Sequence, residues 1–213
     1  MTGSFAGYAL DELRLRSVPL VPEVRLHLAE DATIFWARLQ AEAGVPIAAP
    51  FWVTAWPGGQ VLSRYVLDHP RTVSGKRVLD LASGSGLAAI AAALAGAAQV
   101  TANDTDARAM AAIDANAKVN GVEIFPLPGD LLDAEVGGFD VVMVGDGLYS
   151  PELAEMMLRF LLRQRAQGAD VLVGDPGRGH LPQRQLRLLA TYSQLDTALA
   201  DAQIESASVF RLT

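Results

Sequence analysis

The sequence predicts an α/β protein with a mostly parallel sheet and helices on both faces of that sheet. From about Lys76 onward, short apolar runs alternate with helical stretches. The apolar runs are continuous, which is typical of strands that are buried on both faces. One of them, in "VLDLASGSGLAAI", leads through a glycine-rich turn into a helix, an arrangement found in nucleotide-binding sites.

The expected elements follow one another in a regular order. Strands are expected in "KRVLDLAS", "QVTAND", "GFDVVMVGD" and "ADVLVGDPG", and an edge strand in "EIFPLPGD", whose two prolines remove backbone donors. Helices are expected in "GLAAIAAALAGAA", in "DARAMAAIDANAKVNG", which ends near Asn120-Gly121, and over Pro151 to Gln167. The tail, "RLLATYSQLDT" and "IESASVFRLT", is expected to close the sheet with a pair of strands.

Residues 1–75 precede this unit and are expected to form an extension packed on a core of residues 76–213. The segment "VRLHLAEDATIFWARLQAEAG" predicts a strand and then a helix over Asp31 to Ala43, with Glu30 or Asp31 near its cap. A second helix is expected over about residues 58–67, and Pro70 stops it. A chain of 213 residues is expected to be one domain, or one domain with an appendage.

The composition limits the classes of function. The chain contains no cysteine, which excludes disulfides, zinc–thiolate sites and thiol nucleophiles, and its three histidines show no metal-ligand spacing. The formal net charge is −7 and no basic cluster stands out, so we expect neither a nucleic-acid partner nor a metal site. No secretory signal and no uninterrupted apolar run of about 20 residues is visible, which favours a cytoplasmic protein without a membrane span.

The glycine turn agrees with two kinds of cofactor, and Asp80 separates them. Gly84, Gly86 and Ala89 satisfy the spacing G-x-G-x-x-[GA] of a dinucleotide site. Asp80, however, lies inside the preceding apolar strand, where a carboxylate is costly unless it has a partner. A carboxylate there would repel a pyrophosphate but suits the cationic methionine end of S-adenosylmethionine (AdoMet). We therefore expect AdoMet, and an NAD-dependent oxidoreductase is disfavoured.

Two further carboxylates follow strands at the expected ligand-binding edge of the sheet. Asp104 lies twenty residues after Gly84, where a carboxylate accepts hydrogen bonds from ribose hydroxyls in NAD and AdoMet sites alike. Capping of the next helix is the alternative for Asp104, but Asp106 is favoured for that role. Asp130 ends the third strand, where AdoMet proteins bind the adenine amino group, and a simple turn role after Gly129 is almost as well supported.

Motifs in a fixed order resemble a known family. "VLDLASGSG", "TANDTD", "NAKVNG", "PGDLLD" and "FDVVMVGDGLY" resemble the class I AdoMet-dependent methyltransferases over Lys76 to Val173. "VPEVRLHLAED", "PFWVTAWPGGQVLSRYVLDHP", a D-x-x-Y unit and "GDPGRGHLP" resemble the family 16 protein-lysine methyltransferases. The resemblance implies a Rossmann-like sheet of seven strands and AdoMet as the cofactor.

The resemblance also implies a reaction and a partner. It implies N-methylation of lysine in a protein, with the β-subunit of the electron-transfer flavoprotein as the expected substrate. N-methylation of a small amine such as nicotinamide, and a methyltransferase-like binding module without activity, stay open as alternatives. A monomer is expected, because a protein substrate needs access to the site.

The resemblance places the family's glycine loop on residues 82–86. Ala82 stands where a glycine is usual in methyltransferases, so the backbone is expected to keep a negative φ there. Trp56 is expected to border the cofactor, and a tryptophan buried in the core is the alternative. The expected cofactor-binding residues are Trp56, Asp80, Ala82, Ser83, Gly84, Gly86, Asp104, Asp130, Leu131 and Gly145.

Asp146 and Tyr149 form the D-x-x-Y unit and are the expected catalytic residues. A lysine amine has a pKa of about 10.4 in water and must lose a proton before it attacks a methyl group. Asp146 is expected to orient the ammonium, with Asp146 or water taking the proton, and Tyr149 to bind the amine or to wall the channel. A helix cap is the alternative for Asp146. Arg178, in the loop after the fifth strand, is expected either to pair with Asp175 or to contact the partner protein.

Overall fold

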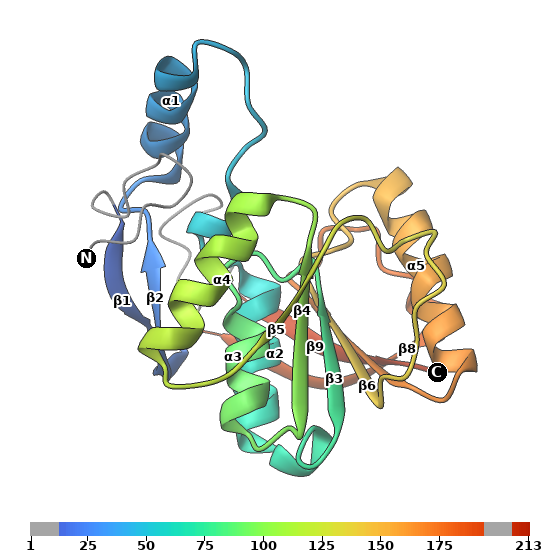
Figure 1. The fold of residues 1–213 in the computed structure, drawn as a ribbon. Coiled ribbons are helices and arrows are strands. Elements are labelled where there is room, and N and C mark those ends of the chain that lie inside the picture. Colours follow the sequence, from blue (N-terminus) through green and yellow to red (C-terminus); the bar gives the residue numbers. More distant parts are fainter. Residues whose placement is uncertain (1–12, 194–205) are drawn as a thin grey trace.

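The computed structural model describes residues 13–193 and 206–213, and a seven-stranded sheet forms its centre (Figure 1). The strand order is β5-β4-β3-β6-β7-β9-β8. The strands are β3 (Arg77–Leu81), β4 (Gln99–Asp104), β5 (Phe125–Pro128), β6 (Val141–Gly145), β7 (Asp170–Asp175), β8 (Leu186–Ser193) and β9 (Ser206–Leu212). Neighbours from β5 to β7 are parallel, and β9 is antiparallel to both β7 and β8. The predicted fold class is therefore confirmed, and β5 is an edge strand as expected.

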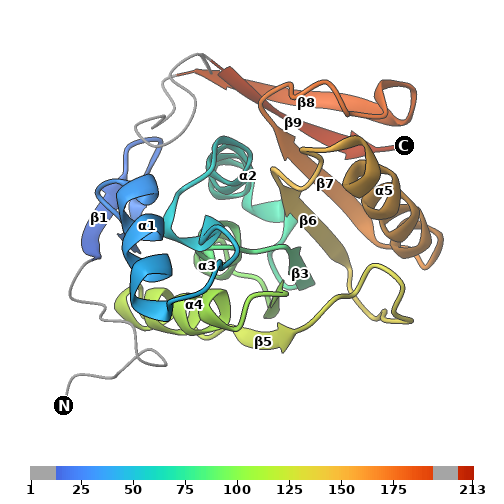
Figure 2. The ribbon, with the colours of Figure 1, turned by 90° about the horizontal axis from the view of Figure 1, so that it is seen from above.

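Five α-helices lie in the described residues, and those around the sheet cover both of its faces (Figure 2). They are α1 (Ala32–Ala43), α2 (Pro57–Asp68), α3 (Leu87–Leu94), α4 (Ala107–Val119) and α5 (Pro151–Ala166). Neighbouring residues of β3 point to opposite faces, as in any strand. Val78 packs with α2 and α3, whereas Leu79 packs with the apolar side of α5. None of the helices within residues 13–193 and 206–213 is long and apolar enough to cross a membrane.

Local chemistry determines where the helices begin. The side chain of Asp31 accepts hydrogen bonds from the first amides of α1, Asp106 accepts one at the start of α4, and Ser150 accepts one at the start of α5. Pro57 occupies the first position of α2, where a missing N–H costs nothing. Asp31 and Asp106 thus have the capping roles that the sequence predicts.

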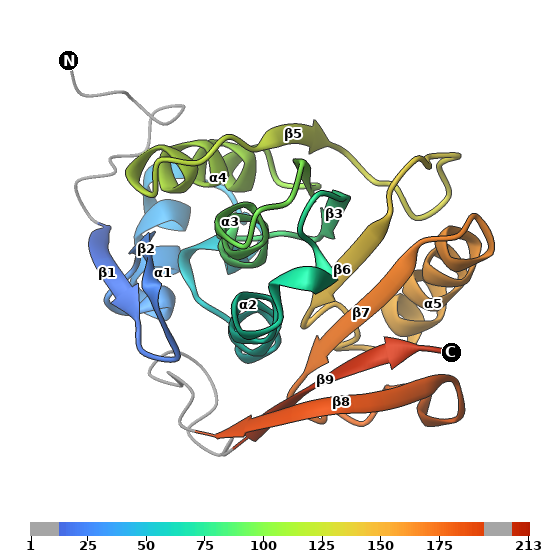
Figure 3. The ribbon, with the colours of Figure 1, turned by 90° about the horizontal axis from the view of Figure 1, so that it is seen from below.

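The first part of the described chain forms a hairpin outside the main sheet (Figure 3). Strand β2 (Val21–Leu28) was expected, but its antiparallel partner β1 (Arg14–Val18) was not. Leu26 of β2 is fully buried and packs with residues at the start of α3, and the backbone N–H of His27 donates to Asn116 of α4. Helix α2, which follows this hairpin in the chain, packs across the β6–β7 part of the sheet. The start of α2 therefore lies beside the strand ends that carry the candidate site.

Candidate active site

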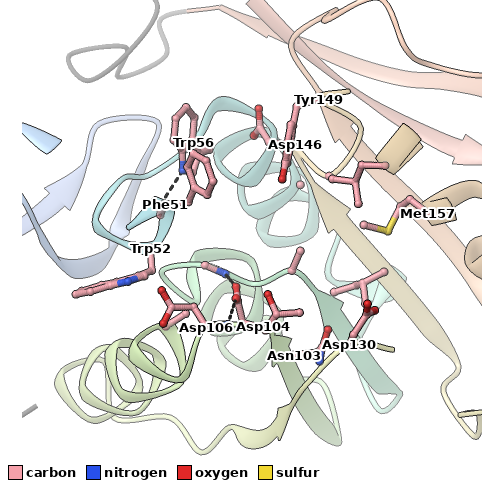
Figure 4. Close-up of a pocket in the computed structure, with 18 of the residues that line it drawn as sticks. Phe51, Trp52, Trp56, Asn103, Asp104, Asp106, Asp130, Asp146, Tyr149 and Met157 are labelled. Carbon is pink, nitrogen blue, oxygen red and sulfur yellow. Dashed lines mark hydrogen bonds between the residues drawn. The ribbon is translucent and has the colours of Figure 1, made fainter. Parts of the chain in front are cut away.

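A cavity of about 710 Å³ opens at the carboxyl ends of β3, β4 and β6, within the range of small-molecule sites (Figure 4). Asp104 and Asp130 lie on one side of it, whereas Trp56, Asp146 and Tyr149 lie on the other. Of the expected site residues, the cavity brings together Trp56, Ala82, Gly84, Asp104, Asp130, Leu131, Gly145, Asp146 and Tyr149. Asp80, Ser83 and Gly86 do not line it.

The glycine turn after β3 corrects one expectation. Ala82 has a φ of +54°, not the negative value expected, and Gly84 and Gly86 have φ values of +54° and +83°. The turn is held by backbone hydrogen bonds from Ser83 to Asn103 (2.8 Å) and from Gly86 to Ser83 (2.9 Å). These contacts keep Ala82 in the left-handed region although its Cβ makes that conformation unfavourable. The side chain of Ala82 is exposed at the cavity.

Asp80 lies behind the glycine turn rather than in the cavity wall. Its carboxylate is buried, and Oδ2 accepts hydrogen bonds from Ser83 Oγ (2.5 Å) and from the backbone N–H of Ala89 in α3 (3.0 Å). Burial raises the pKa of Asp80 to about 7, against the lowering effect of these two donors. The partners that a buried carboxylate requires are thus Ser83 and Ala89, which couple the turn to the helix.

Asp104 is the carboxylate that joins the glycine turn to the next strand end. Its Oδ2 accepts a hydrogen bond from the backbone N–H of Gly84, and its Oδ1 accepts one from the N–H of Asp106, both at 2.9 Å. Burial raises the pKa of Asp104, and these amide donors lower it. Asp106 accepts from the N–H of Arg108 at 2.9 Å, so Asp106 rather than Asp104 caps α4. Asp104 remains at the cavity, where its carboxylate can accept further hydrogen bonds.

The loop after β5 contributes Asp130 and Leu131 to the wall of the cavity. Asp130 Oδ1 accepts a hydrogen bond from the N–H of Leu132 at 2.9 Å, so Asp130 has the turn role that was one of its two alternatives. It also lines the cavity, next to the buried side chain of Leu131. Asn103, which was not among the expected site residues, donates from Nδ2 to the carbonyls of Leu127 (2.7 Å) and Gly129 (2.8 Å) and so holds this segment to β4.

Three aromatic rings form the mouth of the cavity. The centre of the Phe51 ring lies 5.8 Å from the Trp56 ring and 6.1 Å from the Tyr149 ring. Trp56 Nε1 donates to the carbonyl of Phe51 at 2.8 Å, and Trp56 is half-buried at the rim, whereas Trp52 is the tryptophan buried in the core. Phe51 and Tyr149 are each 53% exposed. Phe51 was missed, because only its exposure distinguishes it from a core residue.

Asp146 occupies a strained and enclosed position after β6. Its φ is +54°, it is 8% exposed, and its backbone N–H donates to the carbonyl of Gly174 at 2.9 Å. Oδ2 accepts from the amides of Gly58 and Gly59 at the start of α2, and Oδ1 accepts from Arg178 Nη2 at 3.0 Å. Burial raises the pKa of Asp146 to about 6, whereas Arg178 lowers it. Because Ser150 caps α5, the capping alternative for Asp146 is wrong.

The charged residues that line the cavity are mostly acidic. Among the described residues that line it are four aspartates and one arginine: Asp104, Asp106, Asp130, Asp146 and Arg178. In the described part of the chain, no group of three or more acidic or histidine side chains is placed to hold a metal ion. An acidic wall favours a cationic ligand over a pyrophosphate.

Known proteins resemble both the sequence and the fold. A family model described as ribosomal protein L11 methyltransferase (PrmA) matches residues 61–145. A solved ribosomal protein L11 methylase from Lactobacillus delbrueckii subsp. bulgaricus is similar with a TM-score of 0.52 and 21% identity, over 73% of this chain and 78% of that one. This likeness supports the fold.

Two curated relatives are much more similar in sequence. The electron transfer flavoprotein beta subunit lysine methyltransferase of Rattus norvegicus is 44% identical over 180 residues, which are 82% of this chain and 70% of the relative. The protein of the same name from Xenopus laevis is 41% identical over 196 residues, 89% of this chain and 79% of the relative. The chain therefore belongs to the family of the electron transfer flavoprotein beta subunit lysine methyltransferases.

Proposed function

We propose that this protein is an AdoMet-dependent lysine N-methyltransferase that acts on the β-subunit of the electron-transfer flavoprotein. The names of its relatives support the reaction and the substrate. In the structure, one observation supports it most: a single cavity joins Asp104, at the end of β4, to Asp146 and Tyr149, after β6. The side with Asp104 would bind the cofactor and the side with Asp146 and Tyr149 would bind the substrate, so both would meet in one cavity.

The residues of the cavity fit AdoMet. Asp104 would accept hydrogen bonds from the ribose, because both of its oxygens are already oriented by backbone amides. Asp130 and Leu131 would border the adenine, and Ala82 and Gly84 offer backbone for close approach. Asp80 would support this binding from behind the turn. When bound, AdoMet supplies a methyl group on a cationic sulfur, which suits the acidic wall.

The chain's own residues would receive and orient the lysine side chain. The rim of Phe51, Trp56 and Tyr149 offers aromatic faces to the aliphatic stem and to the ammonium. The carboxylate of Asp146 attracts the ammonium and orients it. Its pKa, raised to about 6, leaves it largely ionised at pH 7, so either Asp146 or water would take the proton that the amine must lose. Most of the acceleration would come from this positioning.

Methyl transfer from isotopically labelled AdoMet to purified electron-transfer flavoprotein tests the proposal, with mass spectrometry to locate the label. We expect label on lysine of the β-subunit. Asp146→Asn is expected to lower the transfer rate at least about 100-fold. Its AdoMet affinity, measured by calorimetry, should change little. Asp133→Asn, at an exposed position outside the cavity, is the matched control and should transfer at the wild-type rate.

Each part of the proposal fails on a different result. Label on another protein but not on the β-subunit would contradict the proposed substrate. Turnover of free nicotinamide without transfer to protein would show that the methyl acceptor is a small amine and not a protein lysine. Binding of NAD but not of AdoMet would contradict AdoMet as the cofactor. Loss of AdoMet binding in folded Asp146→Asn would place Asp146 on the cofactor side.

A further inference from the structure

The loop after β7 directs Arg178 into the cavity. Oδ1 of the buried Asp175 accepts hydrogen bonds from the backbone N–H groups of Gly177 (2.6 Å) and Arg178 (3.1 Å). Gly177 and Gly179, on either side of Arg178, both have left-handed φ values, +89° and +90°. The carboxylate of Asp175 thus holds the turn on its inner side, and the glycines on both flanks permit its left-handed backbone. Its geometry determines where the Arg178 side chain points.

Trp56, Asp146 and Tyr149 form one end of the cavity, which we call its substrate end. The guanidinium of Arg178 contacts two of these residues. Nη2 lies 3.0 Å from Asp146 Oδ1, and the guanidinium carbon lies 5.8 Å from the centre of the Trp56 ring. The Arg178 side chain is only 21% exposed. Trp56 directly precedes α2, and Asp146 accepts hydrogen bonds from the first amides of α2. One cation from the β7 loop therefore connects the β6 loop with the segment that leads into α2.

We propose that Arg178 is a positioning residue: its guanidinium holds the Asp146 carboxylate and the Trp56 indole in place at the substrate end of the cavity. This inference rests on the proposed function, because it gives Arg178 an effect on the reaction through Asp146. An arginine suits the task, since its planar guanidinium can pair with a carboxylate and lie over an aromatic face at once. A lysine would keep the charge but lose the planar contact with Trp56.

The charges around Asp146 come from few sources. From β7 and its loop, Arg178 attracts the Asp146 carboxylate and Asp175 repels it. His180, in the same loop, lowers the pKa of Asp175. From α2, the groups that face Asp146 are the uncharged amides of Gly58 and Gly59. Removal of the Arg178 charge would leave a buried carboxylate beside Asp175, with only amides to stabilise its ionised form. The pKa of Asp146 would then rise above about 6 and approach neutral pH.

Carboxyl carbon-13 NMR titration of the ligand-free protein tests this directly, with the Asp146 signal assigned from its absence in Asp146→Asn. In Arg178→Met the midpoint of Asp146 is expected to move up by about one pH unit or more. Arg178→Lys should restore most of the wild-type midpoint. Arg159→Met, which removes a surface ion pair with Glu155 on α5, is the matched control and should leave the midpoint unchanged.

The pH dependence of kcat for methyl transfer provides the second readout. In Arg178→Met the acid limb should move up with the NMR midpoint, and a shift of about one pH unit would by itself lower kcat at pH 7 by about twofold. Loss of the fixed position of the Asp146 carboxylate should lower kcat further, to at least about tenfold in total. A folded Arg178→Met with the wild-type midpoint and acid limb would overturn the inference, and Arg178→Gln takes its place if the methionine variant does not fold. If the wild-type enzyme transfers no methyl group to the flavoprotein, the proposed function fails, but the NMR titration still decides the role of Arg178.

Discussion

The backbone N–H of Gly58 donates a hydrogen bond to the carboxylate of Asp146, and this contact joins the start of α2 to the end of β6. The approach is so close that a Cβ on Gly58 would overlap the carbonyl oxygen of Gly174 and lie 2.6 Å from both the backbone nitrogen and Oδ2 of Asp146. We therefore predict that Gly58→Ala lowers the free energy of unfolding by at least about 2 kcal/mol, because backbone must move to admit the methyl group. Urea unfolding measures this.

The neighbouring glycine is the control for that prediction. A Cβ on Gly59 would meet no atom within 4 Å. Gly59→Ala is expected to leave stability unchanged or to raise it by up to about 1 kcal/mol, because alanine favours the first turn of a helix. Equal losses in both variants would mean that the close contacts at Gly58 do not determine the cost.

The strands were predictable from the sequence where burial dictates the pattern. Strands β3, β6 and β7 are covered on both faces, so they appear as continuous apolar runs. Strand β1 was not predictable, because Arg14, Leu15, Arg16 and Ser17 are all exposed, so no buried face determines their pattern. Its register comes only from pairing with β2.

The residues of the site were predictable to the extent that they follow strands. Asp104, Asp130 and Asp146 could be located because ligands bind at the carboxyl ends of parallel strands. Their partners could not, because the contact of Asp146 with Gly58 spans 88 positions and its contact with Arg178 spans 32. The positive φ of Ala82 was also hidden, since it results from backbone hydrogen bonds to β4 and within the turn.

The left-handed backbone of Ala82 leads to a second prediction. Ala82→Gly should raise the free energy of unfolding by up to about 1 kcal/mol, because removal of the Cβ relieves the strain at φ +54° and outweighs the added freedom of the unfolded chain. Ala37→Gly, at an exposed position within α1, is the control and should lower it by about 1 kcal/mol. Thermal unfolding of the two variants measures both changes, and a loss of stability in Ala82→Gly would contradict the strain.

Asp104 is predicted to matter for ligand binding more than for folding. Asp104→Ala removes the acceptor of the Gly84 amide at the cavity, so we expect the Kd for AdoMet to rise at least about tenfold, or about 1.4 kcal/mol. Asp31→Ala removes an aspartate that likewise accepts two backbone amides, at the start of α1 and away from the cavity. It should cost about 1 kcal/mol of stability and leave the Kd unchanged. Calorimetric titration compares the two, and wild-type affinity in Asp104→Ala would refute the role.

Asp80 is predicted to make stability depend on pH. Its pKa is about 7 in the folded protein and about 3.9 in an unfolded chain, so the native state binds more protons between these values. The free energy of unfolding should therefore fall as the pH rises from about 4 to 7, by at most about 1.4 kcal/mol per pH unit. Asp80→Asn keeps an oxygen for Ser83 and Ala89 but cannot ionise, so its stability should decline less over this range. Asp133→Asn, at an exposed site, should retain the wild-type dependence. Parallel slopes for wild type and Asp80→Asn in urea unfolding would show that Asp80 titrates alike in both states.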